Sequence, residues 1–292
     1  MNKSFTLIEI LVVIVVIGVL SAFILVGMSS ITSSANIAKS QAFVNSMDNS
    51  LLLARVSQWK LDEVVGSTTA NDSWGTNTGT LSGTAPLAQF QTSGCPSNNC
   101  LSFDGTDDYV NCGNASDFNV TTGNFSVVAW VNPRTISGQF AVGKGSTGTR
   151  QWRLQQWNGY WEFIAADSVG GTSSGTADPL VKINTWYHIV GIKSGTKLYF
   201  YFNGVLQTRT GTLTGDSNVN AADKSVNIGR TNEGFYFNGL IDDVRFYNQA
   251  IPTSEIQQNY YLGLNNLYKN NGITLNEFNQ RLAQLKNNLV KR

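Results

Sequence analysis

An apolar segment near the N-terminus, Phe5–Met28, constrains what this chain can fold into more than any other feature. It reads FTLIEILVVIVVIGVLSAFILVGM, its only ionisable side chain is Glu9, and no charge follows between Ile10 and Ala38. As an α-helix the segment would span roughly 36 Å, enough to cross the hydrocarbon core of a bilayer. We expect Lys3, in the short basic leader, to stay on the cytoplasmic side and so to place the rest of the chain outside.

Glu9 sets this segment apart from other apolar N-termini. The segment is longer than the apolar region of a secretory signal peptide, where a carboxylate near the start is unusual. A plain signal-anchor helix is an alternative, whereas a buried helix of a soluble domain is disfavoured at this length without charges. A carboxylate in hydrocarbon is costly and marks a function. Since no basic residue lies nearby in the segment, the expected partner of Glu9 is a positive charge from another chain.

The segment that begins SFTLIEILVVIVVIGVL at Ser4 resembles the class III signal of type IV prepilins and pseudopilins. The resemblance implies that a prepilin peptidase cleaves between Ser4 and Phe5 and then methylates the new amine of Phe5. It further implies that Glu9, the fifth residue of the mature chain, pairs with that amine on a neighbouring subunit, so that the helices form the core of a filament. The family usually has Gly where Ser4 stands, but the side chain is still small and we expect cleavage.

The same resemblance implies partners and a location. The partners are prepilin peptidase, the membrane and other pilin subunits, of the same or another kind. The precursor would lie in the inner, cytoplasmic membrane with its N-terminus in the cytoplasm, and the mature chain at the cell surface or in an extracellular filament.

Composition excludes several other functions. Charged residues make up 13% of the 292 residues, and 20 Lys and Arg against 19 Asp and Glu give a net charge of +1. Without a clustered basic excess, no nucleic-acid partner and no polybasic membrane contact is indicated. One histidine and three cysteines leave little material for a zinc site or a catalytic triad.

From about Gln58 the pattern changes to alternating aromatic and β-branched segments separated by Gly, Asn, Asp and Ser, which is typical of a β-sandwich. Asn158-Gly159 and Asn203-Gly204 predict two-residue hairpin turns. The strand candidates are Cys100–Phe103, Tyr109–Cys112, Phe125–Asn132, Phe140–Lys144, Trp152–Gln156, Trp161–Ala165, Trp186–Lys193, Lys197–Phe202, Ser225–Ile228 and Gly239–Tyr247. Two helices are expected after them, near 254–268 and 274–290, each opening with a capping-box pattern.

Five blocks of this region resemble, in order and spacing, the laminin G-like jelly roll of the concanavalin A-like lectin/glucanase superfamily. They are WKLDE with NDSWGTNTGTL, CLSFDGTDDYVNCGN, FSVVAWVNP, NTWYHIVGIKSGTKLYFYFNGVL and GLIDDVRFYNQAIPTSEI. The resemblance implies a two-sheet sandwich that often binds carbohydrate or protein. Catalytic relatives carry paired acidic residues on one strand; this sequence has no such run, and we expect no enzymatic activity.

Acidic turns of the head are candidates for calcium, which takes six or more oxygen ligands. The carboxylates in them are Asp104, Asp107, Asp108, Asp242 and Asp243. The resemblance implies one structural calcium held by Asp242 and the carbonyl of Gly105, with Asp104 or Glu63 as helpers. The alternative is that these carboxylates only cap turns and pair with nearby basic side chains.

Trp157 and Tyr160 flank the turn of the predicted hairpin WRLQQWNGYW and are the candidate residues for binding a glycan or another surface ligand. The alternative is that they belong to the core, as alternating aromatic residues of a sandwich usually do. His188 lies in WYHIV without a nucleophile and an acid arranged around it, and we expect it to be structural.

Cys95 and Cys100 enclose Pro-Ser-Asn-Asn, and a disulfide between them is geometrically reasonable in an oxidising compartment. Cys112 is expected to be a buried free thiol. Pairing of Cys112 with Cys100 is the less favoured alternative.

Together these features predict an α+β chain in four parts: a leader at 1–4, a pilin-type helix at 5–57 that crosses the membrane within 5–28, a jelly roll at 58–262 and a helical tail at 263–292. The expected function is structural, a pilin-like subunit that displays a lectin-like head on a filament for adhesion to glycans or surface ligands. The alternatives are a secretion-system pseudopilin, a membrane-anchored lectin-like protein that never polymerises, and a glycan hydrolase.

Overall fold

The computed structural model describes residues 52–84, 87–136, 138–145, 151–175, 180–232 and 234–290. The chain divides into two units, Met1–Leu52 and Leu53–Arg292, and all strands and α-helices below belong to the second. The predicted leader and most of the predicted N-terminal helix lie outside the described residues. None of the helices in the described part of the chain has the length and apolar character needed to cross a membrane.

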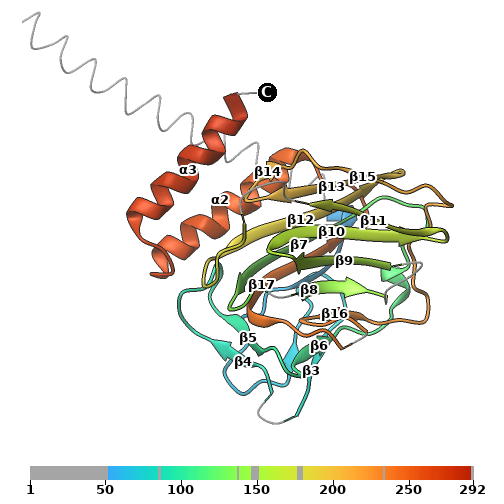
Figure 1. Ribbon diagram of the computed structural model, residues 1–292. Helices are drawn as coiled ribbons and strands as arrows, with labels where there is room; N and C mark the ends of the chain where they lie inside the picture. Colours follow the sequence, from blue (N-terminus) through green and yellow to red (C-terminus); the bar gives the residue numbers. More distant parts are fainter. Residues whose placement is uncertain are drawn as a thin grey trace, which may run out of the picture. The chain divides into compact units, whose positions relative to one another are not determined.

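Two antiparallel sheets form a sandwich (Figure 1). The nine-stranded sheet, sheet A, has the order β14-β13-β12-β7-β17-β5-β4, with β1 paired to β17 and β15 to β13. Its strands are β1 (Arg55–Trp59), β4 (Gln89–Gln91), β5 (Cys100–Asp104), β7 (Phe125–Pro133), β12 (Tyr187–Ser194), β13 (Lys197–Phe202), β14 (Val205–Leu206), β15 (Gly211–Thr212) and β17 (Asn238–Tyr247).

The eight-stranded sheet, sheet B, has the order β11-β10-β9-β8-β16-β6-β3-β2. Its strands are β2 (Thr69–Ala70), β3 (Gly79–Ser82), β6 (Tyr109–Asn111), β8 (Gln139–Lys144), β9 (Gln151–Trp157), β10 (Tyr160–Asp167), β11 (Gly170–Gly175) and β16 (Val226–Ile228). Two short 3-10 helices, η1 (Leu52–Ala54) and η2 (Ser116–Phe118), complete the loops. Every strand candidate named from the sequence is a strand, with ends shifted by a residue or two.

The core between the sheets is rich in aromatic rings because alternate strand positions point inward. Phe125 of β7 and Phe246 of β17 are stacked with ring centres 5.7 Å apart, and Trp152 of β9 lies 5.3 Å from Phe246. All three side chains are at most 1% exposed. Residues from both sheets therefore meet in one apolar cluster, which is what the aromatic alternation of the sequence predicts.

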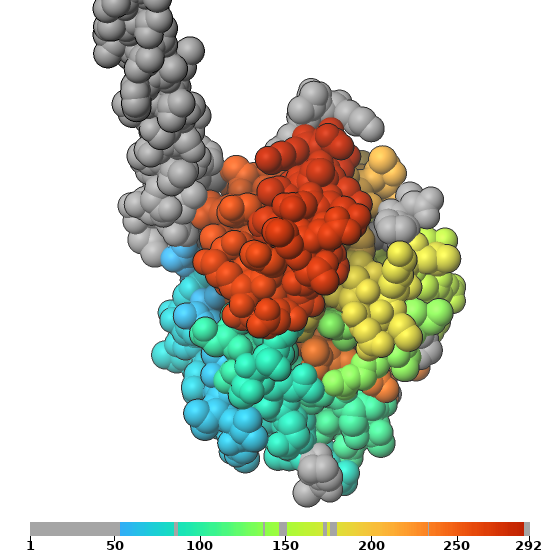
Figure 2. All heavy atoms as spheres, turned by 90° about the vertical axis from the view of Figure 1, so that its left-hand side faces the viewer, coloured from blue at the N-terminus to red at the C-terminus, as the bar shows by residue number. Residues whose placement is uncertain are grey.

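A second, smaller core lies on the outer side of sheet A, where α2 (Thr253–Lys269) and α3 (Leu275–Val290) pack (Figures 1 and 2). Trp130 of β7 is stacked on Tyr260 of α2 at 5.7 Å, and Leu264 and Leu267 are buried beside them. Both helices lie where the capping-box patterns predict them. However, α2 runs through residues 262 and 263, so the expected boundary between jelly roll and tail falls inside a helix, and β1 begins before the expected start at Gln58.

Gly263 is a point of close approach between α2 and sheet A. A Cβ at this position would lie 2.4 Å from Cζ2 of Trp130, whose side chain is 1% exposed and cannot move away. We expect Gly263→Val to lower the free energy of unfolding by about 2 kcal/mol or more through overpacking. Thermal unfolding of the full-length protein in detergent, followed by near-UV circular dichroism, measures this. Gly123→Val is the control, since nothing lies within 4 Å of its Cβ position; equal melting temperatures for the two variants would contradict the prediction.

Candidate functional site

The β9–β10 hairpin carries the two aromatic residues predicted to bind a ligand. Its turn, Asn158-Gly159, has φ angles of 49° and 83°, the left-handed backbone of a type I′ turn. Trp157 and Tyr160 are directly opposite each other across the hairpin, so their side chains share one face of sheet B. Trp157 is 44% exposed, and its ring covers Gly138, where a Cβ would lie 2.4 Å from Cζ3. The structure thus brings the two predicted residues together at the surface.

A ladder of polar side chains continues from this pair along the outer face of sheet B. Trp152 and Leu154 of β9 belong to the core, so Arg153 and Gln155 lie on the other face of sheet B, where neighbouring side chains leave them only 9% and 4% exposed. Arg153 Nε donates a hydrogen bond to Gln155 Oε1 at 2.6 Å. Gln155 Nε2 in turn donates to Glu162 Oε1 of β10 at 2.6 Å. The hydrogen bonds fix the planar guanidinium, amide and carboxylate groups in one row across two strands.

Two further rings extend the row on the side of β8. The Arg153 guanidinium lies 5.1 Å from the ring centre of Phe140, and Phe140 in turn lies 5.5 Å from Phe235, which is 45% exposed. We call the following residues the ladder face: Arg153, Gln155, Trp157, Tyr160, Glu162 and Phe235. Exposed rings stack on the CH faces of sugars, while planar polar groups between them bind hydroxyls. Trp157 and Phe235 supply the exposed rings and Glu162 the polar group, while the buried Arg153 and Gln155 hold Glu162 in place; this arrangement suits a carbohydrate.

Asp242 is buried against the loop that follows Cys95, away from the Gly105 turn. Its carboxylate accepts the N–H of Ser97 at 2.8 Å and the N–H of Asp243 at 2.7 Å. Ser97 Oγ also lies 2.9 Å from Asp62 Oδ1, so a single hydroxyl is shared between two carboxylates. Burial, and then repulsion by Asp243, raise the pKa of Asp242 well above its ordinary value. Both oxygens of Asp242 already accept a backbone N–H, and this leaves little need for a cation.

The four residues predicted for calcium do not come together. In the register of β5 with β17, Asn238 is opposite Asp104 and Ile241 is opposite Leu101. Asp242 therefore lies four residues, or roughly 13 Å, along the strand from the position of Asp104. Glu63 points elsewhere and accepts the N–H of Asn71 at 2.7 Å. Of the predicted set, only Asp104 and its neighbour Gly105 share one loop.

Asp104 instead belongs to a cluster with Asp107 and Asp108, whose carboxylate oxygens lie within 4.8 Å of one another. Asp108 is 2% exposed; its Oδ2 accepts the N–H of Asp104, and its Oδ1 has no hydrogen-bond partner among the described residues. A Cβ at Gly83 would lie 3.1 Å from Asp108 Oδ1 and fill the space beside this oxygen. The glycine leaves that space open. Burial, followed by repulsion from Asp104, raises the pKa of Asp108. These donors fit a hard divalent cation better than the predicted four do.

The cysteines and the histidine lie inside the protein. Cys95 and Cys100 are joined by a disulfide with a Cα–Cα distance of 5.7 Å, and Cys112 is a buried free thiol whose pKa is raised by burial. His188 is fully buried between Trp130 and Tyr260, at ring-centre distances of 5.1 Å and 6.0 Å. Neither ring nitrogen has a hydrogen-bond partner among the described residues, so no described nucleophile is hydrogen-bonded to His188.

Ser4, Phe5 and Glu9, the predicted processing and assembly residues, lie outside the described residues. Sequence reasoning missed Arg153, Gln155 and Glu162. The sequence does carry a pattern that predicts them. WRLQQW alternates core and polar positions, and the hairpin turn at Asn158-Gly159 fixes which residue of the second strand lies opposite each residue of the first.

Comparison with known proteins supports both parts of the chain. A model of the concanavalin A-like lectin/glucanases superfamily matches residues 104–257, more than half of the chain. A model of the prokaryotic N-terminal methylation motif matches residues 1–25. None of the curated proteins matches the sequence.

Solved structures with the same fold include domain 4 of AbnA, a GH43 arabinanase from Geobacillus stearothermophilus, solved with arabinotriose. It has a TM-score of 0.57 and 19% identity, over 71% of this chain and 98% of that domain. The binding domain of botulinum neurotoxin serotype D has a TM-score of 0.56 and 16% identity, over 74% of this chain and 52% of that one. The ligand binding domain of the same serotype with N-acetylneuraminic acid gives 0.52 and 15%, over 73% and 52%.

This chain thus spans almost all of the arabinanase domain and about half of each toxin domain, and identities this low establish a shared fold alone. Together with the family match and the two-sheet topology, they lead to one conclusion. The chain belongs to the concanavalin A-like lectin/glucanases superfamily and carries a prokaryotic N-terminal methylation motif ahead of that domain.

Proposed function

We propose that this chain is a type IV pilin-like structural subunit that displays a lectin-like head on an extracellular filament, and that the head adheres to glycans through the ladder face. The chain performs no reaction of its own. It is made as a precursor in the cytoplasmic membrane, is cleaved by a prepilin peptidase between Ser4 and Phe5, and assembles with other pilin subunits through Glu9. The methylation motif supports the first part.

The observation that carries the glycan assignment is the exposed ring of Trp157 beside a row of fixed planar polar groups. A sugar stacked on the indole would present its equatorial hydroxyls to the carboxylate of Glu162, which accepts hydrogen bonds and is held in place by Gln155. The arabinotriose bound to the arabinanase domain and the N-acetylneuraminic acid bound to the toxin domain support a saccharide as the ligand class.

Trp157→Ala is expected to weaken glycan binding by tenfold or more, because an exposed tryptophan on which a ligand stacks contributes about 2 kcal/mol. The measurement is binding of the full-length protein in detergent to an array of immobilised oligosaccharides. Tyr261→Ala is the matched control, because Tyr261 is 42% exposed on α2, away from the ladder face. Equal binding by both variants and the wild type would refute the assignment of the ladder face.

We further propose that the one structural calcium is bound by Asp104, Asp107 and Asp108 rather than by Asp242. A cation there would supply a partner to the orphaned Asp108 Oδ1 and offset the mutual repulsion of the three carboxylates. Its chemistry would be structural, tying the loop before β6 to the turn at Gly83.

Calcium at millimolar concentration is expected to stabilise the head by about 1–3 kcal/mol, since an ion bound only by the folded state shifts unfolding by mass action. Asp108→Asn should abolish the increase in melting temperature between chelator and calcium. Asp223→Asn should retain it, because Asp223 is exposed and pairs with Lys224 at 2.7 Å. A calcium response that survives Asp108→Asn would rule this cluster out.

A further inference from the structure

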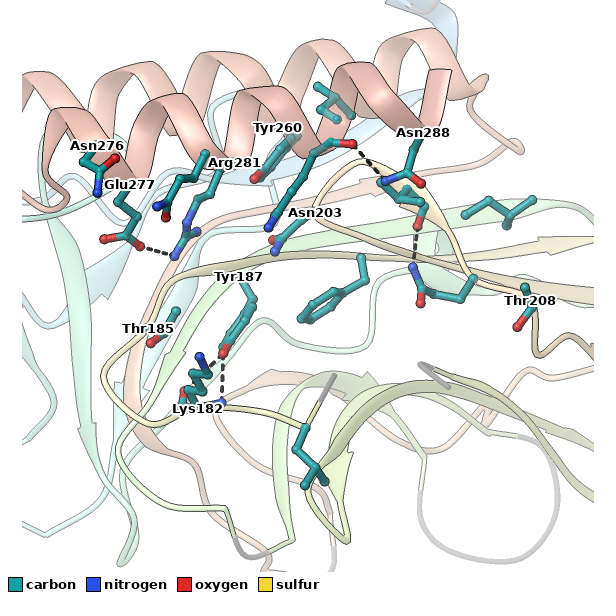
Figure 3. Close-up of a pocket in the computed structure, with 18 of the residues that line it drawn as sticks. Lys182, Thr185, Tyr187, Asn203, Thr208, Tyr260, Asn276, Glu277, Arg281 and Asn288 are labelled. Atoms are coloured by element: carbon teal, nitrogen blue, oxygen red, sulfur yellow. Dashed lines mark hydrogen bonds and ion pairs between the residues drawn. The ribbon is translucent and has the colours of Figure 1, made fainter. Parts of the chain in front are cut away.

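A groove separates α3 from the edge of sheet A formed by β12, β13 and β14 (Figure 3). Its volume is about 850 Å³. Pockets that hold small ligands usually measure roughly 300–1,000 Å³. The groove is on the opposite sheet from the ladder face, and its α3 wall consists of residues after 257, where the match to the superfamily ends. The α3 wall therefore lies outside the segment that the superfamily model matches.

The floor of the groove is apolar and rigid. Tyr187 and Phe202 are stacked with ring centres 4.9 Å apart and are 5% and 6% exposed. Tyr260 of α2 and Leu285 of α3 close the floor from the helical side. The Tyr187 hydroxyl accepts the N–H of Lys182 at 2.8 Å, which holds the ring in place. Such a floor offers fixed apolar area without a rotamer to freeze on binding.

The walls are made of amide and hydroxyl side chains. On α3, Gln280, Gln284 and Asn288 follow one another at intervals of four residues, so they form one row along the helix. The side-chain amides of Gln280 and Gln284 make no hydrogen bond to any other described residue, so their donors and acceptors are available. The opposite wall contributes the side chains of Asn203, Gln207 and Thr208.

The two charges closest to the floor neutralise each other. Arg281 is 8% exposed, and its Nη2 pairs with Glu277 Oε1 at 2.6 Å (Figure 3). Its Nη1 donates a hydrogen bond to the carbonyl of Trp186 at 2.7 Å. Lys182 is exposed at the mouth, where water screens its charge. The polar groups of the groove without a compensating partner are therefore mainly amides and hydroxyls rather than charges.

We propose that this groove is a second ligand site of the head, and that it binds a neutral oligosaccharide. Amides offer both a donor and an acceptor, which matches a hydroxyl that must do both, and the apolar floor matches the CH face of a sugar ring. An acidic ligand would gain nothing from the compensated Arg281–Glu277 pair. The site is independent of the ladder face, so a head that binds through both faces would gain avidity on a surface carrying many copies of a glycan.

The test uses the full-length protein in detergent on an array of neutral tri- to hexasaccharides, acidic oligosaccharides and extended peptides. The variant Gln280→Ala/Gln284→Ala/Asn288→Ala removes the amide row from exposed positions, where alanine favours the helix. Its matched control is Asn279→Ala/Asn287→Ala, which removes exposed amides of the same helix that do not line the groove. Thr208→Trp obstructs the groove from the opposite wall.

We expect both groove variants to lose neutral oligosaccharide binding by at least tenfold on a subset of the array, while the α3 control and Trp157→Ala keep that subset. Binding lost only in Trp157→Ala would overturn the groove site and leave the ladder face standing. Wild-type binding by both groove variants, a preference of the groove for acidic sugars or peptides, or no array binding that depends on the amide row would each overturn this inference.

Discussion

Replacing Glu9 by alanine is expected to abolish surface filaments while the processed chain remains in the cytoplasmic membrane. In the proposed assembly the Glu9 carboxylate compensates the amine of Phe5 on a neighbouring subunit inside an apolar helical core. Removing one partner of such a buried pair leaves the other charge uncompensated, at a cost of about 3–5 kcal/mol. This corresponds to a loss of roughly a hundredfold or more in the association constant of each subunit, repeated along the whole filament.

Electron microscopy of the sheared surface fraction measures assembly, and the N-terminal mass of the membrane-bound chain measures processing. Glu9→Gln should fail like Glu9→Ala, because the amide keeps the shape and loses the charge, whereas Ile10→Leu should assemble. The processed chain should begin at N-methylated Phe5 in every variant. Normal filaments from Glu9→Ala would refute the pairing. A wild-type chain that keeps Met1 and stays in the membrane would favour the anchored, non-polymerising alternative.

The head could be predicted from the sequence where core residues recur at every second position of a strand. In β13, Leu198, Phe200 and Phe202 all lie in the core, and the turns at Asn158-Gly159 and Asn203-Gly204 both have the left-handed backbone that the dipeptides favour. The very short strands β2, β14 and β15 carry no such pattern. Two residues cannot show a period of two, and these strands exist only because longer neighbours offer them a partner.

The candidate sites were harder to predict, because they depend on register. Asp242 and Gly105 both flank the β5–β17 pair, yet the antiparallel register places them at opposite ends of it. The bulge at Asp243, with φ of 45°, is equally invisible in the sequence, although it turns that carboxylate onto Arg245 at 2.6 Å. The groove under α3 requires knowing which face of the helix meets sheet A, and the amphipathic pattern alone predicts only the apolar face.

His188 should make the head sensitive to acid. Burial, together with the nearby Arg245, lowers the pKa of His188 to about 3, and neither ring nitrogen has a hydrogen-bond partner among the described residues. The folded protein therefore keeps the ring neutral, while the unfolded chain takes up a proton near its ordinary pKa of 6.5. The contribution of a neutral His188 to the stability of the folded state is therefore complete above pH 6.5. As the pH falls from 6.5 toward 3, the unfolded chain binds a proton that the folded chain does not, and the free energy of unfolding decreases by up to about 1.4 kcal/mol for each pH unit.

Between pH 6.5 and 5 the free energy of unfolding should decrease by about 2 kcal/mol. The total stability of most domains is about 5–15 kcal/mol, so this loss is measurable. Denaturant unfolding of the full-length protein in detergent, followed by tryptophan fluorescence at pH 7 and pH 5, measures the loss. His188→Phe keeps an aromatic ring between Trp130 and Tyr260 and cannot be protonated, so its stability should not show this fall. Tyr199→Phe on β13 should behave like the wild type.

Because His188 is the single histidine of the chain, the difference between the pH profiles of the wild type and His188→Phe is caused by His188. The raised pKa of Asp242 acts in the opposite direction but is common to wild type and variant, so it cancels from that difference. Parallel profiles for wild type and His188→Phe would show that the ring is already charged, or solvated, in the folded head.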